Sequence, residues 1–233
     1  MWYDAAKIRM RAQTPMEFFE VATSAPTVRR FLDKPIAQRD LETILATANM
    51  APSGSNAQPW EFVVVRDAAT RAEIQRLYLA SWEPYRETSI IRGRKELSPR
   101  AKKALSMGDE FAASLAIVPA HVIVFLDRPK MRVERGSAED LTNFGATYGS
   151  IFPAIELMML AARALGIGSA MTTMLSPHEA ETKALLGVPE HFQLIALIPL
   201  GYPADGFVRP YRKPVWPRIH DGRFGERWHR SGN

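Results

Sequence analysis

The stretch from Ala51 to Trp60 gathers side chains that suit the recognition of a planar ligand rich in nitrogen and oxygen. It holds a glycine, two hydroxyls and two amides between a helix-like and a strand-like segment. Glycine permits unusual backbone angles, small residues leave backbone N–H groups accessible, and amides both donate and accept hydrogen bonds. Because Pro, Ser, Gly and Asn also build turns, a plain connection is the alternative interpretation. The candidate binding residues are Ser53, Gly54, Ser55, Asn56 and Gln58.

Two clusters of cations, one near each end of the chain, suit an anionic group. Thr27–Phe31 places two arginines beside a hydroxyl, and Arg209–Pro214 holds three cations between prolines. Arginine forms planar, charge-assisted forks with phosphate, which makes a phosphate clamp the functional interpretation. A solvated basic turn is the alternative for the first cluster. The candidate residues are Thr27, Arg29, Arg30, Arg209, Arg212 and Lys213.

Several familiar catalytic sites are missing from the sequence. Gly166-Ile167-Gly168 follows a helix-like segment and lacks the third glycine of a dinucleotide fingerprint, so it indicates a helix cap and a turn. There is no phosphate-loop Gly-Lys-Ser/Thr, no His-Glu-x-x-His and no serine elbow, and the five histidines do not cluster like metal ligands. Cysteine is absent, which excludes thiolate catalysis and disulfides. An enzyme of this sequence therefore needs a reactive group that its own side chains do not supply. We expect no metal.

The net charge of +5 is confined to the C-terminal part of the chain. From Arg209 onward there are seven basic and two acidic residues, so the first 208 residues sum to zero. Nucleic-acid domains carry their charge on the folded body, so we expect no nucleic-acid partner. We expect no membrane span either, because no run approaches about 20 apolar residues. The N-terminus lacks the layout of a secretory signal, and a cytoplasmic protein is the expectation.

Apolar periodicity predicts elements that place these motifs around one small sheet. Strands are expected over residues 61–65, 121–126, 169–173 and 194–200, and helices over 15–24, 38–50, 68–81, 147–165 and 177–186. The helix over 147–165 is apolar nearly all round, which predicts burial on every side. Ser176-Pro177-His178-Glu179 predicts a capping box for the last helix. Helices and strands do not repeat as a βα series, so an α+β sandwich is favoured over a doubly wound sheet.

Taken together, these motifs resemble the FMN-dependent nitroreductase superfamily, with features that lean towards its iodotyrosine deiodinase-type branch. The resemblance rests on the runs Arg29–Ile36 and Ala51–Phe62, on Ala164–Gly168 with Thr172-Thr173, and on Ile198–Pro203 with Arg212-Lys213-Pro214. Their order and spacing match from about residue 14 to about residue 217. The Pro-Ser-Gly-Ser form of the loop and the Thr-Thr pair are the features that favour the dehalogenating branch.

The resemblance implies an α+β fold: a three-layer sandwich with a small central sheet flanked by helices, in an intertwined homodimer that binds two FMN molecules at the subunit interface. We expect one domain over residues 1–233, with a core from about 14 to 217. The terminal extensions, 1–13 and 214–233, are then expected to wrap the partner subunit, because their many aromatic residues would otherwise be exposed.

The same resemblance assigns roles to the candidate residues. Thr27 and Arg29 would contact the FMN phosphate or the flavin edge, and Arg212 would reach the phosphate from the C-terminal segment. The loop residues Ser53, Gly54, Ser55, Asn56 and Gln58 would come from the partner subunit and line the isoalloxazine. Met171, Thr172 and Thr173 would lie against the ring. The alternative interpretation of these three residues is an ordinary edge of the sheet. Relatives often carry a basic residue where this chain has Ala25 and Pro26, so Arg30, Arg209 and Lys213 are expected to compensate.

The implied activity is hydride transfer from NADH or NADPH, through FMN, to a nitroaromatic, a quinone or a related small aromatic acceptor. Residues 82–105 are expected to decide the acceptor, with Trp82, Tyr85 and Arg86 in a substrate lid; a solvated helical hairpin is the alternative. Three other functions stay open: a reductive dehalogenase, an enzyme that consumes its own flavin, and a non-catalytic flavin-binding protein. No side chain is nominated as a catalytic acid or base.

Overall fold

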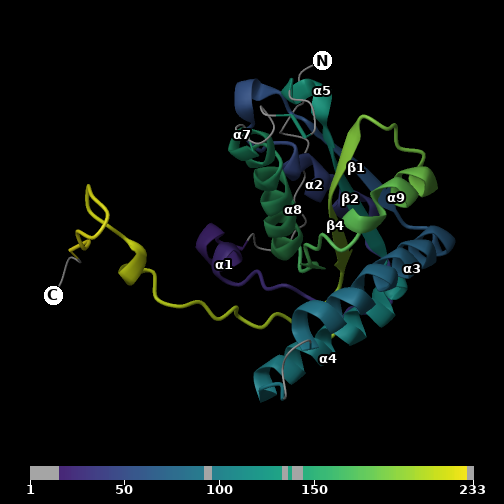
Figure 1. The fold of residues 1–233 in the computed structure, drawn as a ribbon, viewed down its shortest axis with the longest axis horizontal. Coiled ribbons are helices and arrows are strands. Elements are labelled where there is room, and N and C mark those ends of the chain that lie inside the picture. The colour runs from purple at the N-terminus through teal and green to yellow at the C-terminus, as the bar shows by residue number, and fades with distance from the viewer. Residues whose placement is uncertain (1–15, 92–95, 133–135, 138–143, 230–233) are drawn as a thin grey trace.

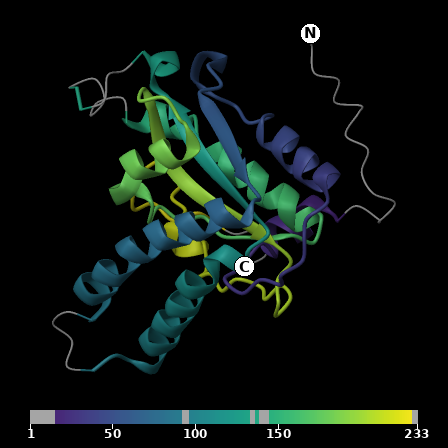
Figure 2. The same ribbon diagram turned by 90° about the vertical axis from the view of Figure 1, so that its right-hand side faces the viewer.

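A four-stranded antiparallel sheet forms the centre of the molecule (Figures 1 and 2). The structure is a computed structural model and describes residues 16–91, 96–132, 136–137 and 144–229. The strand order is β1-β2-β4-β3. The strands are β1 Trp60–Val65, β2 Ala120–Asp127, β3 Gly168–Ser169 and β4 Phe192–Gly201. The runs of branched residues in β1, β2 and β4 suit strands, and the two central strands are buried almost throughout.

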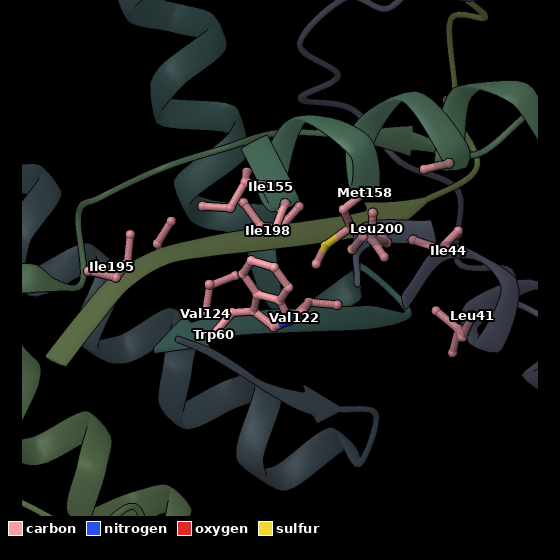
Figure 3. Packing of buried hydrophobic residues seen from close by; sticks show 14 of the residues in the cluster. Leu41, Ile44, Trp60, Val122, Val124, Ile155, Met158, Ile195, Ile198 and Leu200 are labelled. Atoms are coloured by element: carbon pink, nitrogen blue, oxygen red, sulfur yellow. The ribbon is translucent and has the colours of Figure 1, made fainter. Parts of the chain in front are cut away.

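Helices cover both faces of this sheet. On one face, α2 (Gln38–Ala48) and α8 (Phe152–Ala164) pack on β1, β2 and β4 (Figure 3). On α2, helical spacing directs Leu41, Ile44 and Ala48 into this core. On the other face, α3 (Ala68–Tyr85), α4 (Pro99–Ser114) and α9 (Glu179–Leu186) enclose a second apolar cluster. The predicted α+β three-layer sandwich is therefore confirmed.

The remaining elements are short. They are the helices α1 (Phe18–Thr23), α5 (Arg128–Met131) and α7 (Phe144–Gly149), the π-helical turn η3 (Arg86–Ile91), and the 3-10 turns η2 (Gly54–Asn56), η4 (Leu115–Ile117), η5 (Ser176–His178) and η6 (Trp216–Arg218).

The helices α3 and α4 form an antiparallel pair that projects from the sheet (Figure 2). The sequence predicts the first of them, but α3 continues to Tyr85, four residues beyond the expected end. Asp67 caps its start, where the carboxylate accepts a hydrogen bond from the Thr70 N–H at 2.7 Å. Ser98 caps α4 in the same way, and Pro99 occupies the first turn. The helix α4 is the main addition to the expected elements, because no helix was predicted over residues 99–114.

Three sequence predictions need correction. The strand expected over 169–173 is only two residues long as β3, and the chain then touches the sheet through an isolated bridge between Thr172 and Leu197. The helix expected over 147–165 is broken by a turn at residues 150–151, so it begins as α7 and continues as α8. The capping box does not form, because the Glu179 carboxylate accepts a hydrogen bond from the Leu194 N–H instead.

The outer face of α8 is also less covered than predicted. Ile155, Met158 and Ala162 are buried against the sheet, whereas Leu157, Met159 and Leu160 are only half-buried. Within the described part of the chain, Phe144–Ala164 is the one helical stretch long and apolar enough to cross a membrane by length and composition. Core helices of soluble proteins pass the same test, so this feature carries little weight.

The N-terminal segment docks against the far end of the chain. The Val28 N–H donates to the Ser169 carbonyl at 2.9 Å, and the Leu32 N–H donates to the Tyr202 carbonyl at 2.9 Å. The Ala204 N–H in turn donates to the Arg30 carbonyl at 2.9 Å. Gly168 makes this approach possible, because a Cβ there would lie 2.7 Å from a methyl carbon of Val28.

The C-terminal segment from residue 206 to residue 229 extends away from the body (Figure 1). Its end folds on itself through the His220–Arg227 bridge and a hydrogen bond from Arg227 to the Pro217 carbonyl. Tyr211, Phe224 and Trp228 are exposed there. The expected extension over residues 1–13, and residues 230–233 of the other extension, lie outside the described residues.

Candidate functional site

A cavity of about 300 Å³ lies where the N-terminal segment, the residues that follow β3 and the helices α3 and α4 meet. Four of the predicted cofactor-binding residues line it: Thr27, Arg29, Met171 and Thr172. An isolated bridge between Thr27 and Ser169 holds the two segments together. The structure thus gathers motifs that are almost 150 residues apart in the sequence. Thr173 follows as an exposed residue and is not part of the lining.

The helix α3 contributes one wall of this cavity. Tyr78, Trp82 and Tyr85 recur at helical spacing and all line the cavity. The indole N–H of Trp82 donates to Asp109 Oδ1 at 2.8 Å, and the Arg86 Nε donates to the same oxygen at 3.0 Å. Two of the three predicted lid residues therefore face the cavity. The third, Arg86, pairs its guanidinium with Asp109 and with Glu87.

The helix α4 contributes the opposite wall through Ala104, Met107, Gly108 and Phe111. Gly108 faces the indole of Trp82 so closely that a Cβ there would lie 2.4 Å from its ring. Tyr78, Gly108 and Asp109 were not predicted from the sequence as parts of the site. The signal for Tyr78 was its spacing from Trp82, whereas the signal for Asp109 appears only once α3 and α4 pair.

Tyr78 ends a short chain of hydrogen bonds at the cavity. The Met174 N–H donates to Thr172 Oγ1 at 3.3 Å, and that hydroxyl donates to the Tyr78 hydroxyl oxygen at 3.5 Å. Burial raises the pKa of Tyr78, while the Thr172 hydroxyl and the charge of Arg29 act in the opposite direction. The phenol is therefore protonated at neutral pH and has its own proton to donate.

The loop that carries Ser53 to Gln58 adopts a strained backbone. Ser55, Asn56 and Gln58 all have positive φ angles, of 51°, 52° and 45°, which non-glycine residues seldom adopt. Hydrogen bonds hold this shape: the Gly54 N–H donates to Ser150 Oγ at 3.0 Å, and the Gln58 N–H donates to Ser53 Oγ at 2.9 Å. Strained backbone of this kind is typical of functional sites, and the ligand-binding role of the loop stays a prediction.

This loop lies at the opposite end of the sheet from the Thr27 cavity. It leads into Trp60, which pairs with Leu126 of β2, whereas Thr27 adjoins Ser169 beside the Ala120 end. At about 3.3 Å per residue, these ends of β2 are roughly 20 Å apart. Gly54 and Ser55 line a different hollow, of about 720 Å³, together with α5 and α7. Within one chain, the two predicted halves of the site do not meet.

The predicted phosphate cations are spread over the surface of the chain. Arg30 forms ion pairs with Asp205 at 3.2 Å and with Glu110 at 3.8 Å. Arg209 donates to Thr23 Oγ1 at 3.1 Å. Arg212 and Lys213 are exposed in the extended C-terminal segment. Only Arg29 of this group lines the Thr27 cavity.

Comparisons with known proteins agree with this architecture. An iodotyrosine deiodinase of Thermotoga neapolitana is 30% identical over 203 residues, which span 86% of this chain and 92% of that protein. An NADH dehydrogenase of Thermus thermophilus is 28% identical over 194 residues, 81% of this chain and 88% of the relative. The crystal structure of oxidized iodotyrosine deiodinase bound to FMN and 3-iodo-L-tyrosine superposes with a TM-score of 0.65 and 27% identity, covering 85% of this chain and 96% of that one.

The sequence profile of the Nitroreductase family matches residues 23–202, which include the Thr27 cavity, the Ser53 loop and the whole sheet. On the strength of that match and of the fold, this chain belongs to the nitroreductase family.

Proposed function

We propose that this chain is an FMN-dependent oxidoreductase that works as a homodimer and takes hydride from NADH or NADPH. The family supports an oxidoreductase, and the FMN-bound relative supports the choice of flavin. The observation that carries the proposal is the separation of the two site halves. A cavity with Thr27 and Arg29 lies at one end of the sheet, and the strained loop from Ser53 to Gln58 lies at the other.

A second copy of the chain would bring these halves together. The half-buried face of α8, with Leu157, Met159 and Leu160, offers apolar surface for such a contact. In a two-fold symmetric dimer, the same surface of each subunit forms the interface. The loop of each subunit can then reach the cavity of the other, which gives two equivalent sites. The exposed aromatic residues of the C-terminal segment are a further surface that a partner would cover.

The residues present fit the chemistry of FMN. Arg29 and Thr27 line the cavity, where a guanidinium and a hydroxyl suit the flavin edge or the phosphate. Met171 and Thr172 line the cavity just after β3, where Thr172 pairs with Leu197 of β4, and a ring can lie against this edge of backbone. The loop from Ser53 to Gln58 would supply N–H groups and amides from the partner. Arg212 is the proposed phosphate ligand from the C-terminal segment, with Arg30, Arg209 and Lys213 in support.

Bound FMN would supply transfer of hydride or electrons from the nicotinamide to a nitroaromatic, a quinone or a related small aromatic acceptor. The side chains of this chain bind and orient the reactants. A positive charge or an N–H group at the flavin edge, such as Arg29 provides, favours the added negative charge of a reduced ring. The aromatic walls from α3 and α4 exclude water from the ring face.

A second candidate is reductive dehalogenation of a halogenated phenol on the same fold. The specific observation in its favour is the likeness to proteins named iodotyrosine deiodinase, one of them with 3-iodo-L-tyrosine bound. It uses the same cofactor site and differs only in the molecule that occupies the remaining cavity.

The test is the flavin content of the purified protein and its response to reduced nicotinamides. We expect a yellow dimer that holds FMN and bleaches without oxygen when NADH or NADPH is added, with reoxidation by nitroaromatics or quinones. A colourless monomer that FMN cannot load would reject the proposal. A yellow protein that neither nicotinamide reduces would point to a flavin-binding protein without this activity. Turnover of 3-iodo-L-tyrosine in preference to nitroaromatics would favour the second candidate.

A further inference from the structure

The Thr27 cavity is lined mainly by aromatic and thioether side chains. Tyr78, Trp82 and Tyr85 form one side, and Met107 and Phe111 form the other. Among the described residues that line it, Arg29 is the one charged side chain, and no carboxylate is present. Aromatic faces and methionine sulfur favour a flat, polarizable ring. With Arg29 assigned to the flavin, the remaining lining favours a ring without an ammonium group.

The wall formed by Trp82 is held in place on three sides. Its indole N–H donates to Asp109, its ring lies 5.9 Å from that of Tyr85, and its far edge touches Gly108. Because the N–H is already occupied by Asp109, the indole offers the cavity its face rather than a hydrogen bond. Trp82 is therefore a fixed stacking surface, and Asp109 is the residue that positions it.

Tyr78 supplies the polar feature of this otherwise apolar wall. Its ring is fixed edge-on against Phe111, with centroids 5.7 Å apart at 90°. Its oxygen accepts from Thr172 Oγ1, which in turn accepts from the Met174 N–H. With Thr172 Oγ1 as the donor in this contact, the Tyr78 proton is left for a group inside the cavity.

We propose that Tyr78 is the hydrogen-bond donor that selects the substrate, and that the cavity takes an uncharged aromatic ring bearing an acceptor group, stacked on Trp82. The inference rests on the proposed flavin site, because the ring is to be held against FMN. A nitro or quinone oxygen satisfies the Tyr78 donor. A phenol oxygen also accepts, whereas a hydrocarbon ring leaves the donor buried without a partner.

The same cavity disfavours an amino-acid zwitterion. An α-ammonium group taken out of water requires an acceptor, and among the described lining residues no carboxylate provides one. The nearby carboxylate of Asp109 is engaged by both Trp82 and Arg86. A halogenated phenol without the amino-acid portion therefore fits this cavity better than a halogenated tyrosine.

The first test removes the Tyr78 hydroxyl from the FMN-loaded protein. Tyr78→Phe should weaken nitrobenzene binding by about 3- to 10-fold, the usual weight of one neutral hydrogen bond, and leave ethylbenzene binding unchanged or tighter, because no unpartnered donor is then buried. Binding is followed by the change in flavin fluorescence. Tyr202→Phe removes a hydroxyl from a residue outside the cavity lining and serves as the matched control. Equal losses for both ligands, or no loss for either, would overturn the role of Tyr78.

The second test uses the wild-type protein and does not depend on the folding of a variant. The probes are 2-iodo-4-methylphenol and 3-iodo-L-tyrosine, which share a ring and differ by the zwitterion. We expect the phenol to bind at least as tightly as the amino acid. Tighter binding of 3-iodo-L-tyrosine by tenfold or more, or no binding of any ring, would overturn the proposal. FMN content is measured in the same samples, so a failure of the flavin site is recognised separately from a failure of Tyr78.

Discussion

At the scale of single residues, His121 shows how a buried titratable group ties stability to pH. The ring is fully buried at the start of β2, and its Nε2–H donates to the Leu115 carbonyl at 3.0 Å, which fixes η4 against the sheet. Burial is the main cause that lowers its pKa to about 4; the nearby charge of Arg71 acts in the same direction, and the bond to Leu115 opposes them. The folded protein therefore keeps this histidine neutral.

This predicts a loss of stability in mild acid. The unfolded chain takes up a proton near pH 6.5 and the folded chain only near pH 4, so the unfolding free energy falls as the pH drops between these values. The loss attributable to His121 is on the order of 3 kcal/mol, the equivalent of the pKa difference. Urea unfolding of the wild type and of His121→Gln at several pH values measures it. A slope that is equally steep in both proteins would contradict the assignment, and His191→Gln, at an exposed position, serves as the control.

At the scale of elements, the pair α3 and α4 positions the walls of the cavity. Trp82 packs directly on Gly108, and the carboxylate of Asp109 holds the same indole. The two helices can approach this closely only because residue 108 has no side chain. A side chain at residue 108 would therefore displace Trp82, which forms part of the cavity wall.

The expected outcome of Gly108→Ala follows from that constraint. The new methyl group would overlap the pinned Trp82 ring, so we expect a loss of about 1–3 kcal/mol in unfolding free energy and weaker binding of aromatic ligands. Gly145→Ala is the matched control, because it lies in α7 with no atom within 4 Å of the added carbon and should be neutral or slightly stabilising. Equal effects of the two substitutions would show that the α3–α4 contact adapts freely.

The sequence predicted most elements, because their apolar patterns are long and regular. The runs at 61–65, 121–126 and 194–200 are strands within one or two residues of their expected ends. The failures have local causes. The turn at 150–151 interrupts a helix whose composition stays apolar, and Gly108 dilutes the helical signal of α4, in which Leu105 and Phe111 nonetheless face the core. Such breaks depend on tertiary contacts that periodicity does not record.

At the scale of the whole molecule, motif order was enough to predict the family, while the contacts of the candidate residues with FMN stay predictions. Thr27, Arg29 and Thr172 meet at the cavity as the resemblance implied. Tyr78 and Asp109 were missed, because their roles arise from contacts across 94 and 27 residues. The positions of Arg30 and Arg212 relative to a phosphate stay predictions, since both depend on a second copy of the chain.

Subunit mixing tests the proposal that each site is built from two chains. Arg29→Ala and Asn56→Ala should each lower FMN binding when all subunits carry the change. In a mixed dimer, the intact cavity of one chain meets the intact loop of the other, so one site of two is restored. Random assortment of equal amounts should return about a quarter of the wild-type flavin content. If each site lies within one chain, the mixture will bind no more FMN than the average of the two variants.

The docking of residues 27–32 against residues 169–204 has a consequence for how the protein is made. Val28 and Leu32 take their hydrogen-bond partners from Ser169 and Tyr202, which leave the ribosome long after them. Closing so long a stretch of chain is slow, and contacts of this separation form late in folding. The helices α2 and α3 can begin to form while synthesis continues, but the Thr27 cavity can be completed only once the last strand has emerged. A nascent chain that stops before β4 will therefore carry the motif without the pocket.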